Sequence, residues 1–443
     1  MTPDLRTALP LLRAAPRLSP EALAARQAAL LRRLVLHAAT HVPFYRRRFA
    51  EAGVRPEDVR TAADLRRLPT VSKADLRAVP TAERTAAGVD PARLIPFATS
   101  GSSGEPLPVS RTWLEQNLLH LYRLRALHRL GQRPTDRIVS IVRRHHAHAN
   151  DNKLLGRALR AAGVHRKTWI SPDQPAEAIV AELAERRPDL VVAYPATLMR
   201  VAGAMDDAAR RRIRPRFLWC GAEVLLPAVR RAVGEAFAAP LYDLYSCAEA
   251  YSIATECRAG TLHTVDDAVL VEVLCGDRPA EPGERGEVVI TALHSYALPF
   301  VRYRLGDLVE RRAPGCACGQ PFGAIGQVHG RTVDFFTLPG GRVVHPFQFV
   351  SSLLNDEHAW VRRFQLVQER TDHVVLHIAA AEPPPADALA RVRAALAPQF
   401  GAGVAFDIET HETIPDEASG KFRPVRSKVS SLHAPGAAGA PGS

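Results

Sequence analysis

Apolar residues recur at helical spacing in the first ninety residues of the chain. Between Pro20 and Ala39 they fall on one face, a pattern typical of an amphipathic helix that Pro43 would end. Two shorter segments bounded by prolines, 62–65 and 73–76, predict short helices. The apolar face of the long helix consists of Leu23, Leu30, Leu31, Leu34 and Val35, with Arg26, Arg32 and Arg33 off it.

From about residue 95 the pattern changes to β-rich runs that alternate with helical ones. Such alternation favours a mostly parallel sheet with crossover helices, whose functional turns lie at the carboxyl ends of the strands. The predicted strands are 137–142, 190–193, 216–220 and 240–245, and the predicted helices are 177–187 and 227–237.

After about residue 265 shorter apolar runs separated by Gly/Pro turns predict antiparallel strands. They cover 268–274, 286–291 and 308–310. A last unit has strands 360–367, 373–378 and 404–408 and a helix 386–397.

The predicted fold class is therefore α/β. A large N-terminal domain (1–330) with mostly parallel sheets, helices and a β-rich subdomain precedes a small mobile α+β C-terminal domain (331–432). The Ala/Gly/Pro-rich tail, 433–443, is expected to be disordered.

Composition limits the classes of function. The chain has 443 residues, of which 47% are hydrophobic, and a formal charge of +12. Its arginines are spread along the chain without interleaved aromatics, which argues against nucleic acid and fits attraction of anionic substrates such as ATP. No apolar run approaches the length of a membrane span, and the first residues lack a secretory pattern, so we expect a cytoplasmic protein with no membrane partner.

One segment, 97–109, alternates hydroxyl residues with glycines and is followed by Pro106. Glycines let backbone amides turn toward an anion and hydroxyls add donors, so the loop can wrap polyphosphate, although plain loops share this composition. No lysine follows the second glycine, so it is not a Gly-x-x-x-x-Gly-Lys-Ser/Thr loop. The candidate ligands are Thr99, Ser100, Gly101, Ser102, Ser103 and Gly104.

Five further motifs follow in order. They are Cys-Gly-Ala-Glu at 220–223, Tyr-Asp-Leu-Tyr-Ser-Cys-Ala-Glu at 242–249, Phe-Val-Arg-Tyr-Arg-Leu-Gly-Asp at 300–307, Gly-Arg at 330–331, and Ser-Gly-Lys-Phe-Arg at 419–423. Together with segments 40–45 and 64–73, they resemble the acyl-adenylate-forming superfamily, and within it the phenylacetate–CoA ligase-like branch. The resemblance covers nearly all of residues 25–430.

This resemblance implies a nucleotide site. The 99–104 loop would hold the β- and γ-phosphates of ATP. The turn of Gly221, Ala222 and Glu223 would border adenine, and Tyr245 would stack on it.

The resemblance also implies the charged groups of the reaction. Glu249 would bind Mg²⁺, and Asp307 would accept hydrogen bonds from the ribose hydroxyls. Arg331 would approach the ribose or phosphate at the start of the mobile domain. Lys421 would neutralise charge on the α-phosphate and carboxylate in the transition state.

The chain departs from the superfamily pattern at several positions. Ala248 replaces a hydroxyl residue, Leu305 replaces a threonine, and Val333 stands where a polar hinge residue is usual; Ser246 and Leu107 also differ. Because of these changes, the sequence does not establish the rate of the reaction, the hinge motion between the domains, or whether the second half-reaction takes place.

Four residues offer the inventory of a closed tetrahedral zinc site: Cys257, His263, Cys316 and Cys318. Some relatives in the resembled branch have a similar Cys–His pair and later Cys pair. Unligated cysteines are the alternative. Cys220, Cys247 and Cys275 are expected to be small core residues.

The run 143–148, Arg-Arg-His-His-Ala-His, permits a metal interpretation, but its place after a strand favours a loop that lines the acyl pocket. The candidate pocket residues are His146 and, after the next strand, Tyr194 and Pro195.

The sequence thus predicts an enzyme that uses ATP and Mg²⁺ to convert a carboxylic acid to acyl-AMP, then transfers the acyl group to CoA. An amide-forming ligase with an amine acceptor and a non-catalytic ATP- or acyl-binding protein are the alternatives. Lys421 argues against the latter. The sequence does not identify the acid, and it does not decide whether the protein is a monomer or a homodimer.

Overall fold

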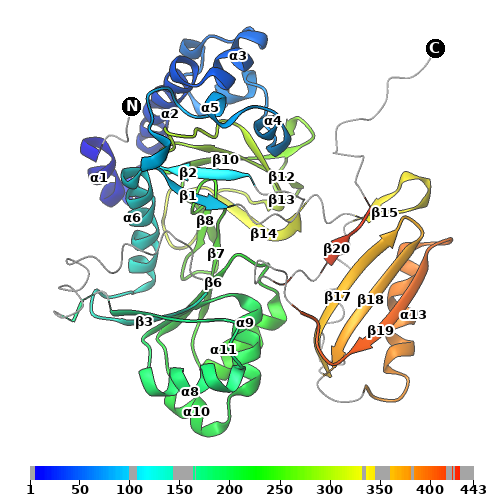
Figure 1. Cartoon of the computed structure of the whole chain (residues 1–443). Coiled ribbons are helices and arrows are strands. Elements are labelled where there is room, and N and C mark those ends of the chain that lie inside the picture. The colour runs from blue at the N-terminus through cyan, green and yellow to red at the C-terminus, as the bar shows by residue number, and fades with distance from the viewer. Residues whose placement is uncertain are drawn as a thin grey trace.

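The computed structural model describes residues 5–98, 107–142, 163–164, 166–331, 336–344, 360–380, 384–415, 422 and 425–429. Figure 1 shows three parts: a helical N-terminal region beside antiparallel strands, a lower α/β region, and the C-terminal sheet to one side. The predicted tail 433–443 lies outside the described residues. No helix in the described part of the chain combines the length and apolarity needed to cross a bilayer.

The N-terminal region is helical, as predicted. Helix α2 (Pro20–His41) begins after Ser19, whose side chain accepts a hydrogen bond from the Ala22 N–H, and its predicted apolar face is buried. Pro43 ends this helix and opens α3 (Pro43–Glu51), because proline suits a first helical position. The other helices and 3₁₀ turns are α1 (Leu5–Ala14), η1 (Ala15–Arg17), η2 (Pro56–Asp58), η3 (Ala62–Arg67), α4 (Lys73–Arg77), α5 (Thr81–Arg84) and η4 (Pro91–Arg93).

A single twelve-stranded sheet runs through the larger part of the molecule, in the order β11-β10-β12-β13-β14-β9-β8-β7-β6-β5-β3-β4. Its parallel part consists of β3 (Arg137–Ile141), β4 (Arg166–Ile170), β5 (Leu190–Ala193), β6 (Phe217–Gly221) and β7 (Leu241–Tyr245). The antiparallel part consists of β8 (Ala254–Glu256), β9 (Leu262–Thr264), β10 (Val269–Cys275), β11 (Arg278–Pro279), β12 (Arg285–Ala292), β13 (Tyr303–Arg311) and β14 (Ala324–Arg331).

Both faces of the parallel part are covered, which explains its continuous apolar runs. Val139 and Leu218 belong to the core beneath α8 (Ala176–Arg186), α9 (Pro195–Ala204), α10 (Asp207–Arg212) and α11 (Pro227–Phe237). Their neighbours Ile138 and Phe217 point the other way, to a smaller core that includes the end of α6 (Trp113–Leu130). The alternation along each strand therefore directs one set of side chains to α8–α11 and the other to the end of α6.

Two short strands, β1 (Ile95–Ala98) and β2 (Pro108–Arg111), form an antiparallel hairpin in which Ala98 pairs with Pro108. The sequence analysis did not predict this hairpin or α6. The pairing brings together the two ends of the Ser/Gly segment, so that segment connects two adjacent strands.

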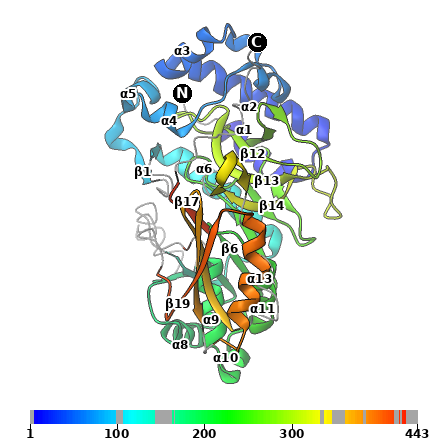
Figure 2. The same ribbon diagram turned by 90° about the vertical axis from the view of Figure 1, so that its right-hand side faces the viewer.

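The C-terminal part has its own core and a four-stranded sheet in the order β19-β18-β17-β20. Helix α13 (Ala388–Phe400) lies against one face of this sheet (Figure 2). The strands are β17 (Val361–Arg370), β18 (His373–Ala380), β19 (Ala405–His411) and β20 (Val425–Ser427); β15 (Phe336–Thr337), η7 (Pro339–Gly341) and β16 (Val343–Val344) precede them.

Candidate active site

The carboxyl ends of three adjacent parallel strands carry predicted site residues. Tyr194 follows β5, the turn 221–223 ends β6, and Tyr245 ends β7. A Cβ at Gly221 would lie 2.5 Å from the Leu244 carbonyl oxygen, so the close approach of β6 and β7 requires glycine there. Ala222 has a left-handed backbone (φ 69°), which turns the chain sharply toward Glu223.

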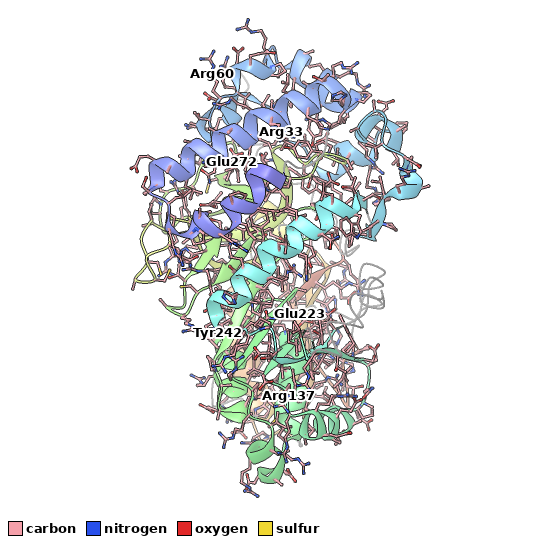
Figure 3. The ribbon with its side chains drawn as sticks, turned by 90° about the vertical axis from the view of Figure 1, so that its left-hand side faces the viewer. Arg33, Arg60, Arg137, Glu223, Tyr242 and Glu272 are labelled. Carbon is pink, nitrogen blue, oxygen red and sulfur yellow. The ribbon has the colours of Figure 1, made fainter. Side chains whose placement is uncertain are left out.

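Glu223 links three segments that are far apart in the sequence. Its Oε2 accepts a hydrogen bond from the Ala196 N–H (2.9 Å) in the first turn of α9, next to the predicted pocket residue Pro195. The positive end of the helix dipole favours a carboxylate at this place. Its Oε1 accepts a hydrogen bond from the Phe422 N–H (3.2 Å). Figure 3 shows Glu223 near the junction of the upper and lower parts.

Phe422 has a defined position in the C-terminal part. The guanidinium carbon of Arg363 on β17 lies 3.7 Å from the centre of its ring, within the range of a cation–π contact. Arg363 also donates a hydrogen bond to the Ile414 carbonyl (2.6 Å). The residue next to predicted Lys421 is therefore held between the C-terminal sheet and Glu223.

Tyr245 and Asp307 are in direct contact. The Tyr245 hydroxyl donates a hydrogen bond to Asp307 Oδ2 (2.6 Å), and both residues are buried. Asp307 lies on β13, directly opposite the backbone of Arg331 on β14. The structure thus brings together three residues that the sequence assigned to nucleotide binding.

Glu249 is buried beside Tyr303. Burial raises the pKa of Tyr303 above its usual range, and the hydrogen-bonded Glu249 carboxylate raises it further. The phenol therefore stays protonated as a donor, and Glu249 retains carboxylate oxygens that can face a cation.

Arg111 is a residue of this region that the sequence analysis missed. It ends β2, is buried, and donates hydrogen bonds to the Ala248 carbonyl and to Gln116 Oε1 (3.5 Å). Burial lowers its pKa. Its guanidinium ties the hairpin around the Ser/Gly segment to the residue before Glu249. The sequence signal was a lone arginine after the short run Pro-Val-Ser at 108–110.

Several predicted site residues lie outside the described residues. These are Thr99, Ser100, Gly101, Ser102, Ser103 and Gly104 of the Ser/Gly segment, His146 of the candidate pocket, and Lys421. Of the other pocket candidates, Tyr194 and Pro195 are buried at the junction of β5 and α9.

The four predicted zinc ligands converge. The ligand atoms of Cys257, His263, Cys316 and Cys318 all lie within 4.8 Å of one another. Cys257 Sγ is 3.7 Å from Cys316 Sγ, and Cys318 Sγ is 3.2 Å from His263 Nε2. Two ligands about 2.3 Å from a tetrahedral ion lie about 3.8 Å apart, so these separations fit a zinc site.

The environment of the four side chains also suits a metal. His263 Nδ1 lies 3.2 Å from the carbonyl oxygens of Phe322 and Gly323, which favours a proton on Nδ1 and leaves Nε2 as the ligand atom. Hydrogen bonding with Thr261 lowers the pKa of Cys316 to about 6, whereas burial raises that of Cys257. Of the remaining cysteines, Cys220 is buried, whereas Cys247 and Cys275 are half-buried.

The chain is similar to known proteins along most of its length. A family model described as AMP-binding enzyme matches residues 11–294, and a model of the CapK C-terminal domain matches residues 338–428. A phenylacetate-coenzyme A ligase of Thermus thermophilus is 29% identical over 381 residues, which cover 82% of each chain.

A crystal structure of 2-hydroxyisobutyryl-CoA ligase in the postadenylation state, with an acyl-AMP, has a TM-score of 0.76. The same ligase with its acyl-AMP and CoA in the thioesterification state has a TM-score of 0.63. The two are 21% and 22% identical, and each comparison covers 94% of this chain and 91% of the other, so they show the shared fold. With the family model matching well over half of the chain, the protein belongs to the AMP-binding enzymes, in the phenylacetate–CoA ligase-like branch of the acyl-adenylate-forming superfamily.

Proposed function

We propose that the protein activates a carboxylic acid with ATP and then transfers the acyl group to coenzyme A. In the first step a carboxylate oxygen attacks the α-phosphorus, and the bond from that phosphorus to the bridging oxygen breaks to release pyrophosphate. In the second step the CoA sulfur attacks the acyl carbon, its proton passes to solvent, and AMP leaves with the electron pair of the acyl–oxygen bond.

The observation that carries this proposal is the buried contact between Tyr245 and Asp307, in a chain of the AMP-binding family. A carboxylate has lone pairs for two donors besides the tyrosine, so Asp307 can accept both ribose hydroxyls while Tyr245 fixes its orientation. With its hydroxyl held in this way, the Tyr245 ring would be positioned to stack on adenine. Arg331, opposite Asp307 on the neighbouring strand, would approach the same ribose or the phosphate.

Glu249 fits Mg²⁺ by its donor chemistry. Mg²⁺ in nucleotide sites takes one or two carboxylates together with phosphate oxygens and waters, and Glu249 supplies one buried carboxylate near the hairpin that carries the Ser/Gly segment. When bound, the ion would offset the negative charge of the phosphates. Tyr303 would hold the carboxylate in position, and Arg111 would keep the hairpin against it.

The C-terminal part would deliver Lys421 to the reacting groups. Phe422, its neighbour in the sequence, donates a hydrogen bond to Glu223 in the turn that is proposed to border adenine, which supports a role for the adjacent lysine at this site. The TM-score is higher with the postadenylation form than with the thioesterification form, so the two parts are arranged more like those of the postadenylation form. Rotation of the C-terminal part would then admit CoA.

We also propose that Cys257, His263, Cys316 and Cys318 hold a structural Zn²⁺. Their spacing, and the His263 tautomer that its carbonyl neighbours favour, support this ligand set. Such an ion would tie the β8–β9 hairpin to the loop before β14, at a site with four protein ligands and no open position.

Exchange of labelled pyrophosphate into ATP tests the function. The protein with Mg-ATP and one of a panel of arylacetic, benzoic, hydroxy and short aliphatic acids should catalyse exchange with at least one acid. When CoA is added to the mixture of protein, Mg-ATP and that acid, a thioester should form. If an amide forms from an added amine and no thioester forms from CoA, the protein is an amide ligase instead. Asp277→Asn, a change to a side chain that is 94% exposed, is a control that should keep full exchange.

Absence of both exchange and ATP binding across the whole panel would refute the enzyme assignment. ATP binding without exchange would instead favour a non-catalytic nucleotide-binding protein.

A further inference from the structure

Two histidines and a glutamate converge on the C-terminal sheet, away from the residues discussed so far. His377 Nδ1 lies 2.9 Å from His411 Nε2 and 3.2 Å from Glu409 Oε2. His411 Nε2 lies 3.6 Å from the same glutamate oxygen. Three atoms that can each serve as a metal ligand therefore lie close together.

The register of two parallel strands produces this meeting. His377 on β18 pairs with Glu409 on β19, and His411 is two residues further along the same strand. Alternate residues of a strand share a face, so all three side chains lie on one face of the sheet. Val374, Leu376 and Ile378 point to the opposite face and pack in the core with α13 (Figure 2).

The face that carries the three residues is open to solvent. The side chains of His377, His411 and Glu409 are 21%, 38% and 55% exposed. An ion bound to them would therefore keep room for water ligands, unlike the closed cysteine–histidine set.

The distances match those between neighbouring ligands of a transition metal ion. Nitrogen and oxygen ligands about 2.0–2.2 Å from an ion lie about 3.3–3.6 Å apart in tetrahedral geometry and about 2.8–3.1 Å apart in octahedral geometry. The three separations observed, 2.9, 3.2 and 3.6 Å, fall within this span. Two imidazoles with one carboxylate suit zinc, nickel, copper or iron better than magnesium or calcium.

The positive charge near the three residues is offset by neighbouring carboxylates. Lys428 acts on His377, but it is paired with Glu369 (2.6 Å), and both Glu369 and Glu409 act on His377 in the opposite sense. On the other side of His377, His373 is hydrogen-bonded to Asp407 (2.9 Å). Glu409 itself supplies the carboxylate that faces the two imidazoles.

We propose that His377, Glu409 and His411 form a binding site for a divalent transition metal ion, distinct from the nucleotide site and from the cysteine–histidine set. The ion would bridge β18 and β19 and stiffen the outer edge of the C-terminal sheet. The proposal does not depend on the reaction that the enzyme catalyses.

The test titrates Ni²⁺ or Zn²⁺ alone into the full-length protein, without a histidine tag, after its initial metal content has been measured. We expect one further equivalent to bind, by calorimetry and by elemental analysis after desalting. His377→Ala and His411→Ala should each weaken this binding by about tenfold or more, and Glu409→Gln should weaken it to a smaller degree.

His373→Ala is the matched control, since it removes a histidine from the same strand and face and should leave the affinity unchanged. Circular dichroism of each variant checks that the sheet is intact. The proposal is overturned if the wild-type protein takes up no further equivalent, or if His373→Ala weakens binding as much as His377→Ala does. Unchanged affinity in all three ligand variants overturns it as well.

Discussion

At the scale of single residues, Lys421 has the most direct role in the proposed reaction. We expect Lys421→Ala to lower kcat/KM for acyl-AMP formation by on the order of 10²–10³, with ATP affinity close to that of the wild type. The reason is that a group acting on transition-state charge contributes little to ground-state binding. Pyrophosphate exchange and equilibrium ATP binding measure the two quantities.

Lys428→Ala is the control for this change, because it removes a lysine nearby in sequence whose partner is Glu369. It should leave both quantities unchanged. Equal rates for Lys421→Ala and the wild type would show that the lysine does not act in the first step.

Asp243 gives a prediction about pH. It lies on β7, and burial together with the neighbouring Glu256 carboxylate raises its pKa from 3.8 to about 7. Between these values the folded protein keeps a proton that the unfolded chain has lost, so stability falls as pH rises through this window. Asp243→Asn removes this dependence, and the variant should gain stability relative to the wild type between pH 5 and pH 8.

Thermal unfolding at the two pH values measures the effect, with Asp277→Asn as a control for an exposed carboxylate. The explanation fails if the difference in Tm between Asp243→Asn and the wild type is the same at both pH values.

At the scale of elements, the cysteine–histidine set is expected to govern stability more than catalysis. The native protein should contain about one zinc per chain at this set, and Cys316→Ser with Cys318→Ser should lose it. Because metal binding is coupled to folding, the double variant should unfold several degrees lower, while its ATP affinity changes little.

Cys275→Ser is the matched control, since this thiol lies outside the set and donates to the Arg285 carbonyl, as a hydroxyl can. Elemental analysis and thermal unfolding measure the outcome. Full zinc content in the double variant would show that these two cysteines are not ligands.

At the scale of the whole molecule, Glu223 connects the large sheet with the C-terminal part. Glu223→Gln keeps one oxygen for the Ala196 N–H but replaces the second acceptor, so the hydrogen bond from Phe422 is lost. A hydrogen bond to a charged group contributes about 1.5–3 kcal/mol. We expect acyl-AMP formation to slow by about tenfold or more, whereas thioester formation from supplied acyl-AMP stays near the wild-type rate.

Glu223→Ala is the comparison, because it also leaves the first turn of α9 without its acceptor and should lower Tm in addition. Separate assays of the two half-reactions and thermal unfolding distinguish the variants. If Glu223→Gln slowed both half-reactions equally, Glu223 would have no role specific to the arrangement of the two parts that is proposed for acyl-AMP formation.

Local sequence was sufficient for many elements with clear periodicity and for the family. Helix α11 has the predicted bounds Pro227–Phe237, and β5 has the predicted bounds Leu190–Ala193, because proline and periodicity mark such boundaries within the segment itself. The prediction of 62–65 as a helix gave the right position, although the turn is a 3₁₀ helix. The motifs also identified the superfamily, since their order along the chain needs no three-dimensional information.

Only the tertiary structure decided which distant groups meet. The joining of parallel and antiparallel strands in one sheet depends on pairings such as β7 with β8, and apolar periodicity carries no record of a strand's partner. Arg111 was missed because its importance comes from the Ala248 carbonyl, 137 residues away. The cluster of His377, Glu409 and His411 likewise follows from the register of β18 and β19, which packing against α13 fixes. The sequence by itself therefore determined the strongly periodic elements and the chemical inventory, whereas long-range register and burial determined how that inventory is assembled.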